Sequence, residues 1–218
     1  MHAETVAELV QQIEVKDLST AAHTWRVVLY ARAMGEEIGL DDADMRLLTH
    51  GAALHDLGKL DTPTEILQKP ARLTPEEFEV ITYHPVSGYA RLVDLGVGDE
   101  LILDLVRYHH ERWDGAGYPY HLAGDEIPVV ARVFAVIDAF DAMTSFRPYR
   151  ADVGPEAAER ALREIERESG THYWPTAVRM FADLYRSGRL AYILDHFNDA
   201  VPVPEYTHER RDPPLPKA

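Results

Sequence analysis

Cysteine is absent from the 218 residues, which excludes disulfides, zinc ribbons and cysteine nucleophiles and favours a reducing compartment. Long apolar runs are missing too. The most apolar stretch, Val129 to Phe140, contains Arg132 and Asp138 and is too short to span a bilayer. Residues 1–4 lack the basic and apolar regions of a signal peptide. We therefore expect a cytoplasmic protein without membrane insertion.

Basic residues are few: 22 lysines and arginines stand against 37 acidic residues, and the net charge is −15. A protein that binds duplex nucleic acid normally carries a basic face, so DNA binding is disfavoured. An acidic surface also repels phosphorylated substrates. Bound divalent cations would offset this repulsion locally, because they add positive charge where the substrate sits.

The spacing of apolar residues is helical almost throughout, and no convincing strand alternation is present. Asp41, Asp99 and the capping box at Thr74-Pro75-Glu76-Glu77 mark helix starts. The predicted helices lie near residues 3–15, 20–34, 41–58, from 74, 99–110, 127–145, 155–168 and from 175. The segment 61–72, with two prolines, is expected to be a loop.

The composition changes near residue 198, and five of the fourteen prolines fall between Pro202 and Pro216. Prolines interleaved with charges favour an extended or disordered segment. We predict one compact all-α domain of roughly seven to nine helices over residues 1–198. A proline-rich tail is expected over residues 199–218.

Two clusters of chemically active residues stand far apart in the sequence. The first is His55-Asp56-Leu57-Gly58-Lys59. In the second, His109 and His110 lead into a turn that ends in Gly117-Tyr118-Pro119. Imidazole and carboxylate groups bind divalent metals, and a neighbouring lysine can hold an anion. The two clusters predict a metal site assembled from distant segments.

Other candidates are ambiguous by themselves. Asp138 follows five apolar residues, so we expect it to be buried and to need either a metal ion or an arginine partner. A lone histidine such as His23 or His84 is more often a hydrogen-bonded core residue than a ligand. Arg147 and Arg150 flank a proline and suit phosphate contacts, although surface ion pairs are the default in so acidic a chain.

The ordered series of motifs resembles the HD-GYP family, a branch of the HD-domain metal-dependent phosphohydrolases, from about Leu9 to Val178. A single His-Asp pair is weak evidence, whereas the whole series is specific. The motifs that carry the resemblance are His23-Thr24-Trp25-Arg26-Val27, His55-Asp56-Leu57-Gly58-Lys59, Lys69-Pro70, Leu73-Thr74-Pro75-Glu76-Glu77-Phe78, His84-Pro85, His109-His110-Glu111, Asp114-Gly115, Gly117-Tyr118-Pro119, Asp138-Ala139-Phe140-Asp141-Ala142-Met143-Thr144 and Arg147-Pro148-Tyr149-Arg150.

This resemblance implies an HD-type helical domain that binds two or three divalent metal ions, usually iron or manganese. One ion would be held by His23, His55, Asp56 and Asp138, and Asp56 would bridge to a second held by His84, His109 and His110. A water or hydroxide activated by both ions would attack phosphorus. Asp56 and Lys59 would be the catalytic residues.

The implied substrate is cyclic di-GMP, hydrolysed to pGpG, with GMP as the product of a second cleavage. Lys59, Tyr118, Arg147 and Arg150 would position the phosphates and the guanine nucleotide. The exposed turn from Asp114 to Pro119 is associated in the family with binding of diguanylate cyclase domains. It would serve such a regulator as a docking site here.

Two residues depart from the family pattern. Ser19 stands where relatives with a third metal carry glutamate, so two metals and a product of pGpG are expected. Trp174 replaces a common aspartate, which leaves activity but alters local packing or substrate entry. The alternatives are a phosphohydrolase of another nucleotide, a non-catalytic cyclic di-GMP receptor or scaffold, and a di-iron oxygenase.

Overall fold

The computed structural model describes residues 1–17, 21–145 and 155–197. These residues form eleven α-helices, two short 3₁₀ helices and no strand beyond isolated bridges. The helices are α1 (Ala3–Asp17), α2 (Ala21–Ile38), α3 (Asp42–Leu54), η1 (Leu57–Asp61), α4 (Thr64–Leu67), α5 (Pro75–Ile81), α6 (His84–Asp94), α7 (Glu100–Tyr108), η2 (Gly124–Glu126), α8 (Val129–Thr144), α9 (Pro155–Arg167), α10 (Pro175–Arg186) and α11 (Ala191–His196). The all-α prediction is confirmed.

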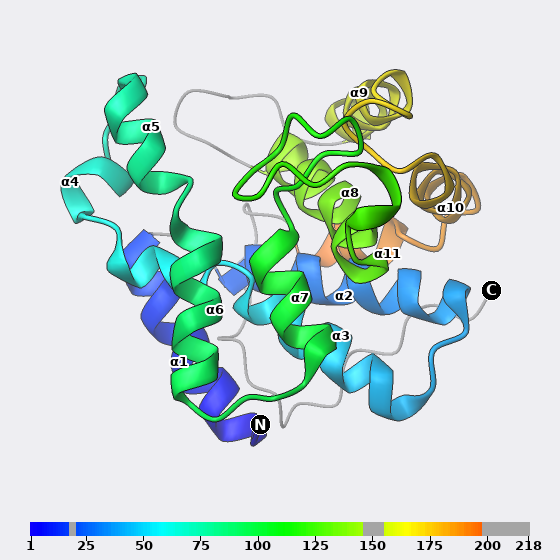
Figure 1. Cartoon of the computed structure of the whole chain (residues 1–218). Coiled ribbons are helices and arrows are strands. Elements are labelled where there is room, and N and C mark those ends of the chain that lie inside the picture. Colours follow the sequence, from blue (N-terminus) through cyan, green and yellow to red (C-terminus); the bar gives the residue numbers. More distant parts are fainter. Residues whose placement is uncertain (18–20, 146–154, 198–218) are drawn as a thin grey trace.

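Four helices form a closed ring of contacts at the centre of the fold: α2 packs on α3, α3 on α7, α7 on α8, and α8 on α2. Figure 1 shows α1, α5 and α6 on one side of this ring and α9 to α11 on the other. Helix α6 packs on η1 and α7, and α10 packs on α2, α8 and α9. The outer helices therefore cover the ring from two sides.

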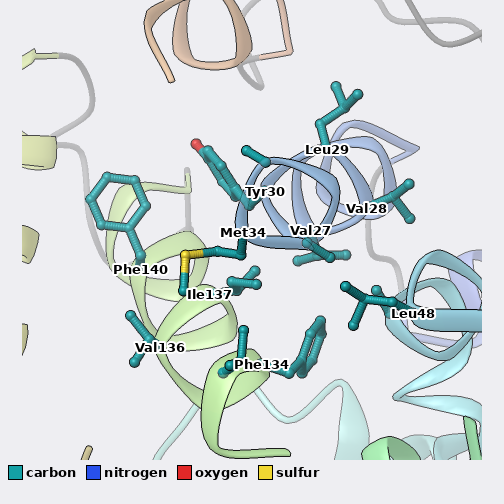
Figure 2. Packing of buried hydrophobic residues seen from close by; sticks show 14 of the residues in the cluster. Val27, Val28, Leu29, Tyr30, Met34, Leu48, Phe134, Val136, Ile137 and Phe140 are labelled. Carbon is teal, nitrogen blue, oxygen red and sulfur yellow. The ribbon is translucent and has the colours of Figure 1, made fainter. Parts of the chain in front are cut away.

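The core lies mainly between α2 and α8. Figure 2 shows Tyr30 and Met34 of α2 facing Ile137 and Phe140 of α8. The Tyr30 and Phe140 rings meet edge to face, with their centroids 5.7 Å apart. Each of these side chains is fully buried. Burial of a large apolar side chain contributes about 1.5–3 kcal/mol, so this interface fixes the angle at which α8 crosses α2.

Local sequence signals explain several helix starts. The Asp41 carboxylate accepts hydrogen bonds from the backbone N–H groups of Ala43 and Asp44. Thr74 and Glu77 form the predicted capping box at the start of α5. Such caps contribute about 1 kcal/mol each and define where the helix begins.

The structure adds detail that the sequence pattern did not reveal. The expected loop 61–72 contains the one-turn helix α4, and the segment from Thr74 divides into α5 and α6 before His84. The third helix ends at Leu54, and the 3₁₀ helix η1 follows. Among the described residues, no helix is both long and apolar enough to cross a bilayer. The predicted tail, residues 199–218, lies outside the described residues.

Candidate metal centre

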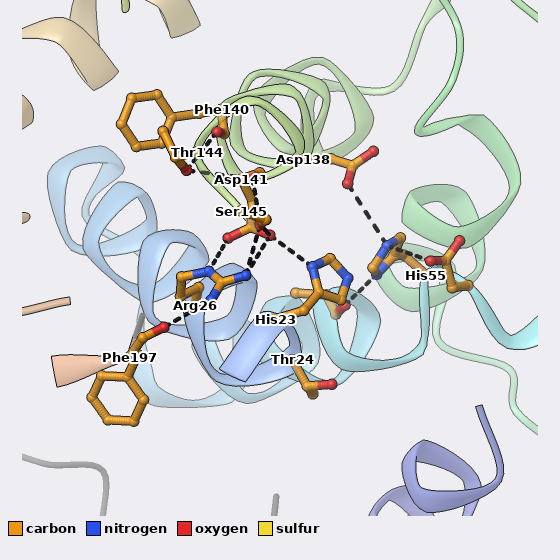
Figure 3. Close-up of polar contacts among 12 residues, drawn as sticks. His23, Thr24, Arg26, His55, Asp138, Phe140, Asp141, Thr144, Ser145 and Phe197 are labelled. Atoms are coloured by element: carbon orange, nitrogen blue, oxygen red, sulfur yellow. Dashed lines mark hydrogen bonds and ion pairs between the residues drawn. The ribbon is translucent and has the colours of Figure 1, made fainter. Parts of the chain in front are cut away.

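The ends of four helices bring most of the predicted ligands together, and Asp138 joins them from within α8. His23 lies in the first turn of α2, His55 follows α3, and His84 begins α6. His109 and His110 follow α7 directly. Figure 3 shows the His23 and His55 rings close to each other, with Asp138 of α8 directed toward His55. Residues from five helices therefore converge on one region.

Three of the histidine rings are oriented by backbone carbonyl groups. The Nδ1 atom of His55 lies 2.8 Å from the carbonyl oxygen of Ala52, and that of His84 lies 2.8 Å from Ile81 O. His109 Nδ1 lies 2.9 Å from the carbonyl oxygen of residue 106. A carbonyl oxygen can only accept a hydrogen bond, so each Nδ1 carries the hydrogen. In the neutral ring, Nε2 then has a free lone pair, which is the form that binds a metal ion.

The donor atoms form two groups of three, and within each group the atoms lie within 4.8 Å of one another. One group consists of His84, His109 and His110, and the other of His23, His55 and Asp56. Asp56 lies between the groups, because its Oδ2 is 3.2 Å from His55 Nε2 and its Oδ1 is 3.4 Å from His84 Nε2. Asp138 Oδ1 lies 3.9 Å from His55 Nε2.

One contact tests whether these residues suit a cation. His84 Nε2 and His109 Nε2 lie 3.2 Å apart. Because both rings use their Nδ1 hydrogen on a carbonyl oxygen, neutral rings have no hydrogen to place between the two Nε2 atoms. Two lone pairs at that distance repel each other, and a cation between them would remove the repulsion. The residues therefore fit a divalent ion.

The electrostatic setting keeps two of these histidines neutral and favours the charged form of a third. Burial lowers the pKa of His84 to about 3 and that of His109 to about 4, so both rings are neutral near pH 7. Burial also lowers the pKa of His55, but Asp56 and Asp138 outweigh it and raise that pKa to about 9. The pKa of Asp56 lies below its usual value because the cationic partners His55 and Lys59 outweigh burial.

Two glycines allow η1 to approach α6. A Cβ atom on Gly58 would lie 1.9 Å from the carbonyl oxygen of His84 and 2.6 Å from the backbone nitrogen of Gly88. No residue larger than glycine can occupy position 58 without moving α6 away. This close crossing brings the His55-Asp56 pair next to His84.

Lys59 lies between two carboxylates. Its Nζ is 2.8 Å from Asp56 Oδ2 and 2.8 Å from Asp17 Oδ2, at the end of α1. Burial alone would lower the pKa of Lys59, but the two carboxylates raise it above its usual value, so the ammonium group stays charged. The sequence singled out Lys59, but not Asp17, whose relevance depends on how α1 packs against η1.

The predicted turn folds back onto the histidine pair. The backbone N–H of Tyr118 donates to the carbonyl oxygen of His110, and their rings lie 4.7 Å apart. A Cβ on Gly117 would lie 2.3 Å from the backbone nitrogen of Arg112, so the turn needs glycine there. The buried Glu111 accepts the N–H groups of residues 120 and 122 and holds the turn closed.

Asp138 is less buried than expected, since 22% of its side chain is exposed. The fully buried carboxylate of α8 is Asp141, one helical turn later, and it pairs with Arg26. The expectation of a buried acid with an arginine partner therefore applies to Asp141 rather than Asp138. The available signal was the polar residue Asp141 on the same apolar helix face, three positions after Asp138.

Trp174, the departure from the family pattern, has a structural environment of its own. Its ring stacks with that of Trp113, with centroids 6.4 Å apart. The guanidinium of the buried Arg132 lies over both rings, at 5.4 Å from Trp113 and 5.3 Å from Trp174. This arrangement joins Trp113, the residue before the turn 114–119 (the signature turn), to the segment before α10. Three other candidates, Ser19, Arg147 and Arg150, lie outside the described residues.

Comparison with known proteins agrees with this geometry. Residues 7–177 match the HD domain family. The chain belongs to that family. The match confirms the resemblance carried by the ordered motifs and covers every described candidate ligand.

The names of individual relatives state a more specific activity than the family match does. A cyclic di-GMP phosphodiesterase of Thermotoga maritima is 42% identical over 176 residues, which cover 78% of this chain and 46% of the relative. A 3′3′-cGAMP-specific phosphodiesterase of Vibrio cholerae is 31% identical, over 83% of this chain and 34% of the relative. The chain thus spans less than half of the length of either relative.

A solved structure shares the fold. The protein Bd1817 of Bdellovibrio bacteriovorus, described as an HDG"Y"P protein, matches with a TM-score of 0.61 at 22% identity. The match covers 77% of this chain and 53% of that one. At this identity the likeness concerns the arrangement of the helices alone.

Proposed function

We propose that this chain is a metal-dependent phosphodiesterase that hydrolyses cyclic di-GMP to pGpG at a two-metal centre. The observation that carries the proposal is the position of Asp56, with one carboxylate oxygen toward each group of donors. Such a carboxylate can bridge two ions. The name of the Thermotoga relative supports the substrate.

Two sets of residues would hold the two metal ions. His23, His55, Asp56 and Asp138 would hold one ion, and His84, His109 and His110 would hold the other with Asp56. Two divalent ions, iron or manganese, would supply charge stabilisation at the phosphoryl oxygens and lower the pKa of a water. Hydrolysis would add a water to phosphorus, break the P–O3′ bond and leave a proton on the 3′ oxygen.

Two residues outside the ligand set would handle the substrate. Lys59 carries its charge next to Asp56, where it can pair with a phosphate oxygen. Tyr118 lies against His110 and can contact the nucleotide. The acidic chain thus would bind an anionic substrate through local positive charge, in spite of its net charge of −15.

The direct test is to purify the chain anaerobically, measure its metal content, and follow cyclic di-GMP with iron and with manganese. We expect pGpG as the first product, separated by chromatography. Asp56→Asn should bind fewer ions and lose turnover by at least about 100-fold, since the bridge supports both ions. Binding of cyclic di-GMP without turnover in any metal state would instead favour a receptor.

A second candidate substrate is 3′3′-cGAMP, because the Vibrio relative is named for it. Both compounds are cyclic dinucleotides that contain a guanine nucleotide and phosphodiester bonds. Parallel measurements of kcat/KM on the two substrates decide between them. A clear preference for 3′3′-cGAMP would overturn the proposed specificity but leave the reaction type intact.

A further inference from the structure

Asp141 occupies the centre of a buried polar network between α2 and α8. Its side chain is 1% exposed, and its Oδ2 lies 2.8 Å from Nδ1 of His23. Arg26 donates from Nε to Oδ1 at 2.5 Å and from Nη2 to Oδ2 at 3.2 Å. The hydroxyl of Ser145 donates to Oδ2 at 2.9 Å. Figure 3 shows these side chains converging behind His23, on the side away from His55.

The groups around Asp141 determine where the hydrogen lies. Arg26 donates to both carboxylate oxygens and the Ser145 hydroxyl donates to Oδ2, so each of these neighbours places a hydrogen toward the carboxylate. Asp141 therefore acts as a hydrogen-bond acceptor, and Arg26 and His23 also hold its pKa below its usual value in spite of burial. The hydrogen in its contact with His23 consequently belongs to Nδ1.

His23 differs from three other candidate ligands in the group that orients its ring. His55, His84 and His109 are oriented by carbonyl groups three residues earlier in the chain. The partner of His23 Nδ1 is a side chain 118 residues away, on another helix. The orientation of this one ring therefore depends on a residue that a point mutation can remove.

We propose that Asp141 is a positioning residue that fixes His23 as the Nδ1–H tautomer, with Nε2 directed at a metal ion. The proposal rests on the two-metal centre proposed above and adds a residue outside its ligand set. Partners of metal-binding histidines typically contribute 10- to 100-fold to metal affinity. Arg26 supports the same arrangement, because its hydrogen bonds to both carboxylate oxygens hold Asp141 in place.

A purely structural role for Asp141 would also make its loss destabilising, so stability alone does not distinguish the two. The tautomer of His23 does. In the metal-free, ¹⁵N-labelled chain, long-range ¹H–¹⁵N spectra report which ring nitrogen carries the hydrogen. At about pH 8 we expect hydrogen on Nδ1 of His23 in the parent, and a shift toward Nε2–H in Asp141→Asn. The His55 signals should not change, because Ala52 O orients that ring.

Metal titration provides the second measurement. Calorimetry with manganese should show that Asp141→Asn weakens one of two binding events by about 10- to 100-fold and leaves the other near the parent value. The matched control is Asp125→Asn, which removes a carboxylate paired with Arg132 at 2.7 Å, outside the centre. The control should keep both affinities and the His23 signals.

Two results would overturn the positioning role: hydrogen on Nε2 alone of His23 in the parent, or parent-like affinity for both ions in Asp141→Asn. If Asp141→Asn does not fold, the spectrum of the parent chain still shows which ring nitrogen of His23 carries the hydrogen. A parent chain that binds two ions but hydrolyses no cyclic dinucleotide would defeat the proposed function alone, because the tautomer measurement does not depend on turnover.

Discussion

At the scale of single residues, the centre combines two ways of orienting an imidazole. The carbonyl groups of Ala52, Ile81 and Val106 lie in the last turns of α3, α5 and α7. Such carbonyls have no N–H partner within their own helix. The histidine N–H groups satisfy them, so one hydrogen bond both ends a helix and orients a ligand.

Replacement of Lys59 should affect substrate more than metal. We expect Lys59→Met to lower kcat/KM by about 10- to 100-fold, because a hydrogen bond to a charged group contributes about 1.5–3 kcal/mol. Metal content measured by atomic emission should stay at the parent value. The matched control is Lys69→Met, which removes a half-buried lysine paired with Glu77. Equal losses in the two variants would contradict a role of Lys59 at the substrate.

The sequence predicted the identity of the candidate ligands better than their surroundings. The ordered motifs singled out all seven, and the structure brings them to one region. The sequence did not reveal Asp141 as a partner of His23 or Asp17 as a partner of Lys59. Their contacts with His23 and Lys59 depend on the packing of α8 and α1, which no local spacing specifies.

At the scale of secondary-structure elements, the crossing of η1 and α6 determines whether the two donor groups meet. Gly58→Ala would place a Cβ 1.9 Å from His84 O, so α6 must shift. We expect a loss of about 1–3 kcal/mol in the free energy of unfolding, as for other overpacked sites, and reduced metal content. Chemical denaturation and metal analysis measure the two effects.

The control for this substitution is Gly98→Ala, because a Cβ at Gly98 has no neighbour within 4 Å. It should leave stability within about 0.5 kcal/mol and metal content unchanged. A Gly58→Ala variant with the parent's metal content would show that the crossing tolerates expansion.

The signature turn and the segment before α10 are joined through Trp174. Trp174→Asp, which restores the residue common in the family, removes the contact with Arg132 and the stacking on Trp113. We expect a loss of about 0.5–2 kcal/mol in stability, with metal content unchanged. Thermal unfolding and metal analysis test this, and a variant that loses bound metal would place Trp174 closer to the centre than its contacts indicate.

Helix starts were the most predictable part of the fold. Capping residues such as Asp41 and Thr74 act through hydrogen bonds to the next few residues, so the sequence contains the signal. The break between α5 and α6 was not predicted, although Pro85 in the first turn of α6 was an available local signal. The short helix α11 also escaped prediction, because it has no side-chain cap.

At the scale of the whole molecule, metal loading should reverse how stability depends on pH. In the metal-free chain, the pKa of His55 is raised from 6.5 to about 9. The contribution of His55 to the free energy of unfolding is complete below about pH 6.5 and is lost as pH rises toward 9. His84 and His109 have lowered pKa values of about 3 and about 4, so their contribution is lost as pH falls below 6.5. Together these three histidines should therefore stabilise the metal-free chain most near pH 6.5.

Bound ions require a neutral His55, so metal binding releases its proton and tightens as pH rises toward 9. Thermal unfolding between about pH 5 and about pH 9, with chelator and with manganese, measures both curves. We expect Tm to fall above neutral pH with chelator and to rise with manganese. Parallel curves under the two conditions would contradict the assignment of His55 as a ligand.

The convergence of five helices on one centre also has a consequence for the polymer as a whole. Metal ions bound by ligands from His23 to Asp138 would link segments of the chain that lie far apart in the sequence. Because the site does not persist in the unfolded chain, the free energy of metal binding would add to the free energy of unfolding, whereas a disulfide acts by restricting the unfolded chain. A protein without a single cysteine would then be cross-linked after all, by bonds that a chelator can cut and a metal salt can restore.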